Sequence, residues 1–159
     1  MLLEIHSTTA YLDGSKLTNE HHTVHVIRDP GARIAKMKGK QIDSDTDVIL
    51  IHAGTNNVKS TEPEALADEV LETMKHIQDK HKKAQLVFSS IFRRKDNHQL
   101  NAKVSKTNEI LKKTLLLNGF DYVDNDNILF SNLAKDGLHI NEGGMRKFAS
   151  NVSRYIRYC

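Results

Sequence analysis

An aspartate and a histidine close to the C-terminus of this chain could together carry acid–base chemistry. They are Asp136 and His139, the first and last residues of the segment Asp-Gly-Leu-His. An aspartate that accepts a hydrogen bond from one imidazole nitrogen orients the ring and stabilises its cation, so that the other nitrogen can act as a base. A turn that carries an incidental histidine has the same spacing, and for this segment taken alone that simpler interpretation is the stronger one.

Two further loops contain groups that could bind negative charge. Gly54-Thr55-Asn56-Asn57 follows an apolar run, and an asparagine side chain donates an N–H without carrying charge, which suits a developing oxyanion. In Pro30-Gly31-Ala32, the glycine lets the backbone approach a ligand and direct an N–H at it. The alternatives are local hydrogen bonding by the two asparagines and a plain turn at the glycine. A phosphate-binding loop at residues 54–57 is a third interpretation, but the second glycine and the lysine of a P-loop are absent.

Strand-like and helix-like segments alternate along the chain and would position these loops. Strands are predicted at residues 23–27, 48–51, 86–88 and 120–123, and the second of them is a continuous apolar run typical of a strand covered on both faces. Apolar residues at spacings of three and four predict a short helix at 34–37, the two longest helices at 62–80 and 99–118, and a last helix after residue 141. This alternation implies parallel crossovers. The predicted fold class is α/β, a three-layer α/β/α sandwich with a mostly parallel, flavodoxin-like sheet.

Two helix starts carry capping signals. Thr61 and Glu64 have the spacing of a capping box, in which Thr61 would be the N-cap. Asn141 is the expected N-cap of the last helix.

The first 20 residues depart from the alternating pattern. They are predicted to form a helix and a loop, and no apolar strand precedes them. The sheet is therefore expected to lack its first strand, which lies centrally in a fold of this kind. Each unpaired backbone group left buried by such a gap costs roughly 1–3 kcal/mol. A marginally stable or aggregation-prone chain is expected unless the flanking strands close the gap.

The three candidate loops are expected to meet at one edge of the sheet. Ligand sites in open parallel sheets form at the carboxyl ends of the strands. Gly31, Asn56, Asp136 and His139 should converge there, with the aspartate within about 3 Å of the histidine, the reach of an orienting hydrogen bond.

Taken together, the loops resemble the sequence blocks of the SGNH (GDSL-type) hydrolases. That family carries a Gly-Asp-Ser near its start, a glycine after the second strand, a Gly-x-Asn-Asp and a late Asp-x-x-His. Gly31 is similar to the second block, and Asp136 with His139 to the fourth. Residues 54–57 are similar to the third block, with Asn57 where aspartate is usual.

The resemblance extends from residue 1 to about residue 156 and is densest in two stretches. Residues 48–57 and 136–144 look especially like SGNH-like domains of invertebrate, often mobile-element-associated, proteins. The resemblance implies a serine esterase or acyl hydrolase that needs no metal and no cofactor. The implied substrate is a small-molecule ester.

The resemblance also implies a role for each site residue. His139 would be the base and Asp136 the residue that holds it. The N–H of Gly31 and the side chain of Asn56 would bind the oxyanion. The supporting loop would consist of Gly54, Thr55 and Asn57.

The Gly-Asp-Ser block is absent from the chain, and with it the nucleophile that the resemblance requires. In relatives, the segment similar to residues 1–5 closely follows that block. The single domain, residues 1–159, is therefore expected to be incomplete at its N-terminus and inactive as it stands. A degenerate SGNH-like binding or accessory module and a truncated gene product are the alternatives.

The serines present are weak substitutes for that nucleophile. Ser15, in an Asp-Gly-Ser sequence, is expected at the end of the first helix, and Ser7 within it. Ser89 and Ser90 end a predicted strand but align with a non-catalytic stretch of the family.

Composition narrows the partners and the compartment. The 159 residues carry a net charge of +3 with acidic and basic residues mixed, so a solvated surface is expected and nucleic-acid binding is not. The single cysteine, Cys159, excludes an internal disulfide. No apolar run approaches the ~20 residues that span a bilayer. Glu4 interrupts any signal peptide at once, so a cytoplasmic location without membrane contact is expected. The oligomeric state has no signature in the sequence.

Overall fold

The computed structural model of the chain describes residues 2–5, 15, 17–18 and 23–156, and their strands form one parallel sheet. The strand order is β2-β1-β3-β4-β5, and every neighbouring pair is parallel. The strands are β1 Leu2–Ile5, β2 His25–Arg28, β3 Val48–His52, β4 Gln85–Ser89 and β5 Asp121–Val123. The predicted parallel sheet is therefore confirmed.

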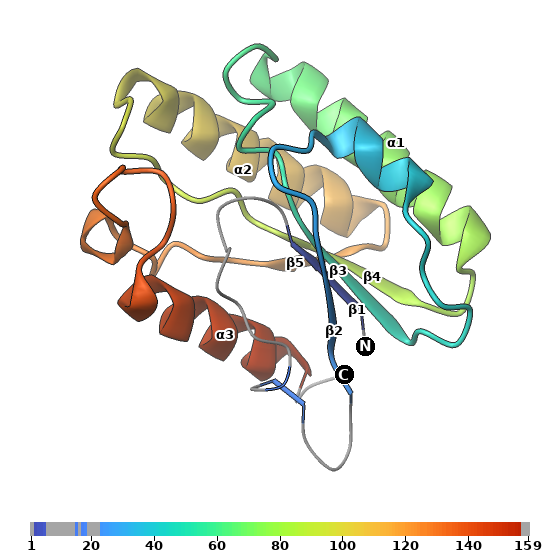
Figure 1. Cartoon of the computed structure of the whole chain (residues 1–159). Helices are drawn as coiled ribbons and strands as arrows, with labels where there is room; N and C mark the ends of the chain where they lie inside the picture. The colour runs from blue at the N-terminus through green and yellow to red at the C-terminus, as the bar shows by residue number, and fades with distance from the viewer. Residues whose placement is uncertain (1, 6–14, 16, 19–22, 157–159) are drawn as a thin grey trace.

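Helices cover both faces of this sheet (Figure 1). The α-helices are α1 Pro63–Lys80, α2 Gln99–Leu117 and α3 Glu142–Ile156, and the 3-10 helices are η2 Ile34–Gly39 and η3 Phe130–Asn132. α1 and α2 lie on one face and α3 on the other, as a three-layer sandwich requires. α1 and α2, with 18 and 19 residues, are the longest helices among the described residues, as predicted.

Alternate residues of the central strands supply two separate cores. Ile49 and Ile51 of β3 belong to the core beneath α1, α2 and η2. Leu50, between them, belongs to the core beneath α3, where Phe148 and Val152 are fully buried. The apolar run of β3 thus reflects a strand that is covered on both faces.

The expectation that the first strand is absent is wrong. β1 occupies the centre of the sheet, where Leu2 pairs with both His25 and Ile49, and Ile5 with both Arg28 and His52. A strand of four residues that includes Glu4 is too short and too interrupted to produce an apolar run, which is why the sequence pattern does not reveal it. The expected gap is filled by β1, which removes the ground for expecting low stability. The helix predicted for the rest of this segment falls mostly on residues 6–14, outside the described part of the chain.

The capping box predicted at Thr61 does not form. The N-cap of α1 is Glu62, and Pro63 is the first helical residue. A residue that precedes proline is disfavoured in the helical conformation, and Glu62 is accordingly extended, with ψ of 153°. The helix therefore begins one residue too late for Thr61 to cap it. The other prediction is confirmed, because Asn141 Oδ1 accepts the N–H of Gly144 at 3.0 Å.

Candidate active site

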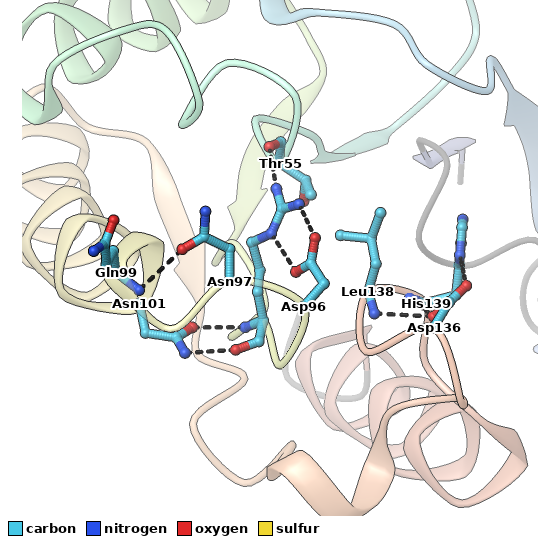
Figure 2. A network of polar contacts seen from close by, with 9 residues as sticks. Thr55, Asp96, Asn97, Gln99, Asn101, Asp136, Leu138 and His139 are labelled. Atoms are coloured by element: carbon cyan, nitrogen blue, oxygen red, sulfur yellow. Dashed lines mark hydrogen bonds and ion pairs between the residues drawn. The ribbon is translucent and has the colours of Figure 1, made fainter.

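The structure brings Asp136 and His139 together in one loop before α3 (Figure 2). Nδ1 of His139 lies 2.6 Å from Oδ2 of Asp136. The other carboxylate oxygen, Oδ1, accepts the backbone N–H groups of Leu138 at 2.9 Å and of His139 at 3.0 Å. These three hydrogen bonds, led by that of Leu138, lower the pKa of Asp136 from 3.8 to about 2. The carboxyl group is therefore ionised at neutral pH and holds the imidazole through Nδ1, which makes Nε2 the nitrogen that could act as a base.

A tight hairpin supports this pair. Leu133 and Ile140 form an antiparallel bridge, and the N–H of Ala134 donates to the carbonyl of His139 at 2.7 Å. Gly137, with φ of +69°, turns the chain between the aspartate and the histidine. The side chain of His139 is 39% exposed, so a substrate can reach it.

The predicted oxyanion donors lie on two loops that contact each other. Nδ2 of Asn56 points at the carbonyl of Ala32 at 3.4 Å, and among the described residues its second N–H has no partner. Gly31 has φ of +79°, and a Cβ there would meet no atom within 4 Å. Among the described residues, the N–H of Gly31 donates to no partner. Both groups have the free N–H that their predicted role requires, and that role stays a prediction.

Asn57 holds the predicted oxyanion loop, residues 54–57, to its surroundings. Its Oδ1 accepts the buried N–H of Ile34 in η2 at 3.2 Å, and its Nδ2 donates to Oε2 of Glu69 in α1 at 3.0 Å. An aspartate, which is usual in the SGNH block, could accept the first bond but could not donate the second. The asparagine at this position is therefore explained by its hydrogen bond to Glu69 on α1. It contributes to the packing of the loop rather than to the reaction.

Gly54 and Thr55 are fixed by the loop that follows β4. A Cβ on Gly54 would lie 2.8 Å from Cδ1 of Ile91, so the close packing there leaves no room for a side chain. The carbonyl of Thr55, a buried residue, accepts a hydrogen bond from Nη1 of Arg94 at 3.1 Å.

Sequence reasoning did not single out Arg94. Its side chain is 1% exposed and forms an ion pair with Asp96 at 2.6 Å (Figure 2). The hydrogen bonds from Arg94 lower the pKa of the Asp96 carboxyl. No local signal could have identified this residue, because its neighbour Arg93 is also an arginine and is exposed.

The serines at the end of β4 are structural. Ser89 is 0% exposed and Ser90 2%, and their hydroxyl groups accept hydrogen bonds from Asn125 at 2.7 Å and 2.9 Å. Ser89 also contacts the buried ring of His52 at 3.2 Å. Both hydroxyl groups are thus inaccessible to a substrate. Ser15 is exposed, whereas Ser7 lies outside the described residues.

Comparison with known proteins rests on structure alone, since no family model and no curated protein matches the sequence. A member of the lipolytic protein G-D-S-L family from Veillonella parvula superposes with a TM-score of 0.77 at 15% identity, over 99% of this chain and 98% of that one. A GDSL-like lipase from Bacteroides thetaiotaomicron gives a TM-score of 0.77 at 12% identity, over 99% and 87%. A lipase/acylhydrolase from Enterococcus faecalis gives 0.75 at 12%, over 98% and 94%.

The chain has the fold of the GDSL lipolytic hydrolases. The fold accounts for the parallel sheet with helices on both faces and for nearly the whole length of the chain. Within the described part of this GDSL-type fold, no cluster of three or more histidine, cysteine, aspartate or glutamate side chains could hold a metal ion. None of its described helices is both long and apolar enough to cross a membrane.

Proposed function

We propose that this domain is an SGNH-type ester hydrolase scaffold whose base and oxyanion groups are in place. The hydrogen-bonded pair of Asp136 and His139, in the fold of the GDSL lipolytic hydrolases, is the observation that carries the proposal. The substrate class is a small-molecule ester, as the lipase and acylhydrolase names of the structural neighbours suggest.

Each group has a defined task in this reaction. A serine hydroxyl attacks the ester carbonyl, and Nε2 of His139 takes its proton while Asp136 stabilises the imidazolium. The carbonyl oxygen becomes an oxyanion, which receives hydrogen bonds from the N–H of Gly31 and Nδ2 of Asn56. The oxyanion then collapses, the ester C–O bond breaks, and His139 gives the proton to the leaving alkoxide. In the second half, His139 takes a proton from water as the water attacks the acyl-enzyme, and returns it to the serine oxygen as the acid leaves.

In this proposal, the component that the chain lacks is the nucleophile. The chain contains no Gly-Asp-Ser, and the buried Ser89 and Ser90 cannot replace it. We therefore propose that the chain as it stands does not turn over esters at a useful rate. It would then serve as a binding or accessory module, and only a residual ~10³–10⁴-fold acceleration over water would remain.

One observation favours a second candidate, an active esterase. β1 ends at Ile5, and the next serine along the chain is Ser7, two residues later. The SGNH resemblance implies a nucleophile that closely follows the first strand. Ser7 lies outside the described residues, so its support comes from its place in the sequence.

Hydrolysis of short p-nitrophenyl esters distinguishes the two candidates. The chain would be assayed beside Ser7→Ala and His139→Ala. The first candidate predicts the same background rate in all three proteins. Turnover that both substitutions abolish would establish the second candidate and overturn the first. A double substitution, Ile5→Gly with His6→Asp, restores the missing block before Ser7 and should create His139-dependent turnover if only that block is lacking.

A further inference from the structure

Residues 94–96 contact both the oxyanion loop, residues 54–57, and the base loop, residues 136–139. We call residues 94–96 the bridge. We propose that Arg94 is a positioning residue, which holds these two loops at a fixed separation. The inference rests on the proposed function for its consequence in catalysis. The contacts themselves do not depend on that function.

The side chain of Arg94 reaches the oxyanion loop. Its Nη1 donates to the carbonyl of Thr55, the residue directly before Asn56, at 3.1 Å. Its Nε and Nη2 donate to the two carboxylate oxygens of Asp96 at 2.9 Å and 2.6 Å, in a bidentate pair (Figure 2). A guanidinium that is 1% exposed needs such complete pairing, because an unpaired buried charge is strongly unfavourable. The geometry of this arginine is therefore tightly defined.

The backbone that follows Arg94 reaches the base loop. The N–H groups of Lys95 and Asp96 both donate to the carbonyl of Gly137, at 2.7 Å and 3.2 Å. A Cβ on Gly137 would lie only 2.7 Å from the backbone nitrogen of Asp96, so this approach requires glycine. Gly137 stands next to Asp136 and two residues before His139. The position of the base loop thus depends directly on residues 94–96.

The bridge itself is anchored to α2. Oδ1 of Asn101, in the first turn of α2, accepts the N–H of Arg94 at 2.7 Å, and its Nδ2 donates to the Arg94 carbonyl at 2.5 Å. The backbone of Arg94 is thus hydrogen-bonded to α2. Its side chain contacts the oxyanion loop, and the next two peptide groups contact the base loop. The guanidinium fork of Arg94 also holds the carboxylate of Asp96, whose N–H donates to the carbonyl of Gly137, so loss of the fork should disturb both loops together.

Arg94→Lys tests this arrangement, with Arg93→Lys as the matched control at the exposed neighbouring position. Lysine keeps the charge but cannot reproduce the bidentate fork. In proton–nitrogen correlation spectra, Arg94→Lys should shift the amide signals of residues 54–57 and of residues 136–139, whereas Arg93→Lys should shift neither group. Unchanged signals in either loop of a folded Arg94→Lys protein would overturn the proposal.

Gly137→Ala changes the base-loop residue that the bridge contacts, and it tests the proposal if Arg94→Lys does not fold. It should shift the amide signals of residues 94–96 and of residues 54–57, which lie beyond the bridge. A shift confined to the hairpin around residue 137 would overturn the proposal.

Kinetics separate positioning from simple structural support. In whichever form of the chain shows His139-dependent turnover, Arg94→Lys should lower kcat by ~10²-fold, the effect of misplacing groups by about 1 Å, and leave KM unchanged. A change in KM alone would contradict a positioning role. If the variant with Gly-Asp-Ser restored at residues 5–7 also turns over no ester, the proposed scaffold role fails, and the amide signals still decide whether Arg94 couples the two loops.

Discussion

Nδ2 of Asn57, in the predicted oxyanion loop, donates a hydrogen bond to Oε2 of Glu69 in α1, over 3.0 Å. Asn57 is 1% exposed and Glu69 is half-buried, so this bond is partly shielded from water. Its other amide atom, Oδ1, is engaged with η2, so a single side chain connects three elements around the candidate site.

Asn57→Asp should destabilise the fold because it places two carboxylates against each other. We expect a loss of about 1–3 kcal/mol in the free energy of unfolding, the usual cost of a broken buried hydrogen bond. Denaturant unfolding at neutral pH measures it. Glu69→Gln in the same protein removes the repulsion and restores a donor, so it should recover most of the loss. Full stability in Asn57→Asp alone would show that the contact with α1 contributes nothing.

The carboxyl of Asp136 should make stability depend on pH in the acid range. Its pKa is about 2 in the folded chain, against 3.8 ordinarily. As the pH falls, the unfolded chain binds the proton first. The stabilisation is therefore complete above about pH 4 and is lost as the pH falls towards 2. Asp136→Asn should reduce the slope of unfolding free energy against pH in this window, whereas Asp68→Asn, at an exposed position on α1, serves as the control.

Asp29 should contribute to the same window. Hydrogen bonds from Lys40 and Lys36 lower its pKa to about 2. Asp29→Asn combined with Asp136→Asn should therefore reduce the slope of unfolding free energy against pH in this acid range more than either change alone. An unaltered slope in the double variant would mean that other carboxylates govern the acid transition.

Two of the three positive-φ glycines of the site, Gly31 and Gly137, should differ in their tolerance of alanine. Gly31→Ala should cost about 1–2 kcal/mol, the strain of a left-handed residue with a side chain, because the space above Gly31 is open. Gly137→Ala should cost more, since its Cβ would also press on the backbone nitrogen of Asp96. Thermal melts of the two variants test the order, and an equal shift in Tm would contradict it.

The central place of β1 predicts strong protection from hydrogen exchange. The amides of residues 3–5 should exchange as slowly as those of β3, since β1 is paired on both sides. Glu4→Pro removes one ladder donor from the middle of the sheet and should lower Tm markedly. Fast exchange throughout residues 2–5 would contradict the observed pairing.

Local signals in the sequence were sufficient for much of this protein. The apolar periodicity of α1 and α2 and the apolar run of β3 reflect packing that repeats along each element, so the elements could be placed to within a few residues. The contact between Asp136 and His139 was also predictable. Two residues three apart in one tight turn meet through the geometry of the turn itself.

Tertiary contacts decided the rest. β1 is a strand because partners 23 and 47 residues later pair with it, although its own four residues show no pattern. Arg93 and Arg94 are the same residue type in the same loop, and only Arg94 is enclosed, by Thr55, Asp96 and α2. Pairing and burial depend on which distant groups arrive at a position. A sequence read locally contains the residues of this site but not the bridge that holds its loops together.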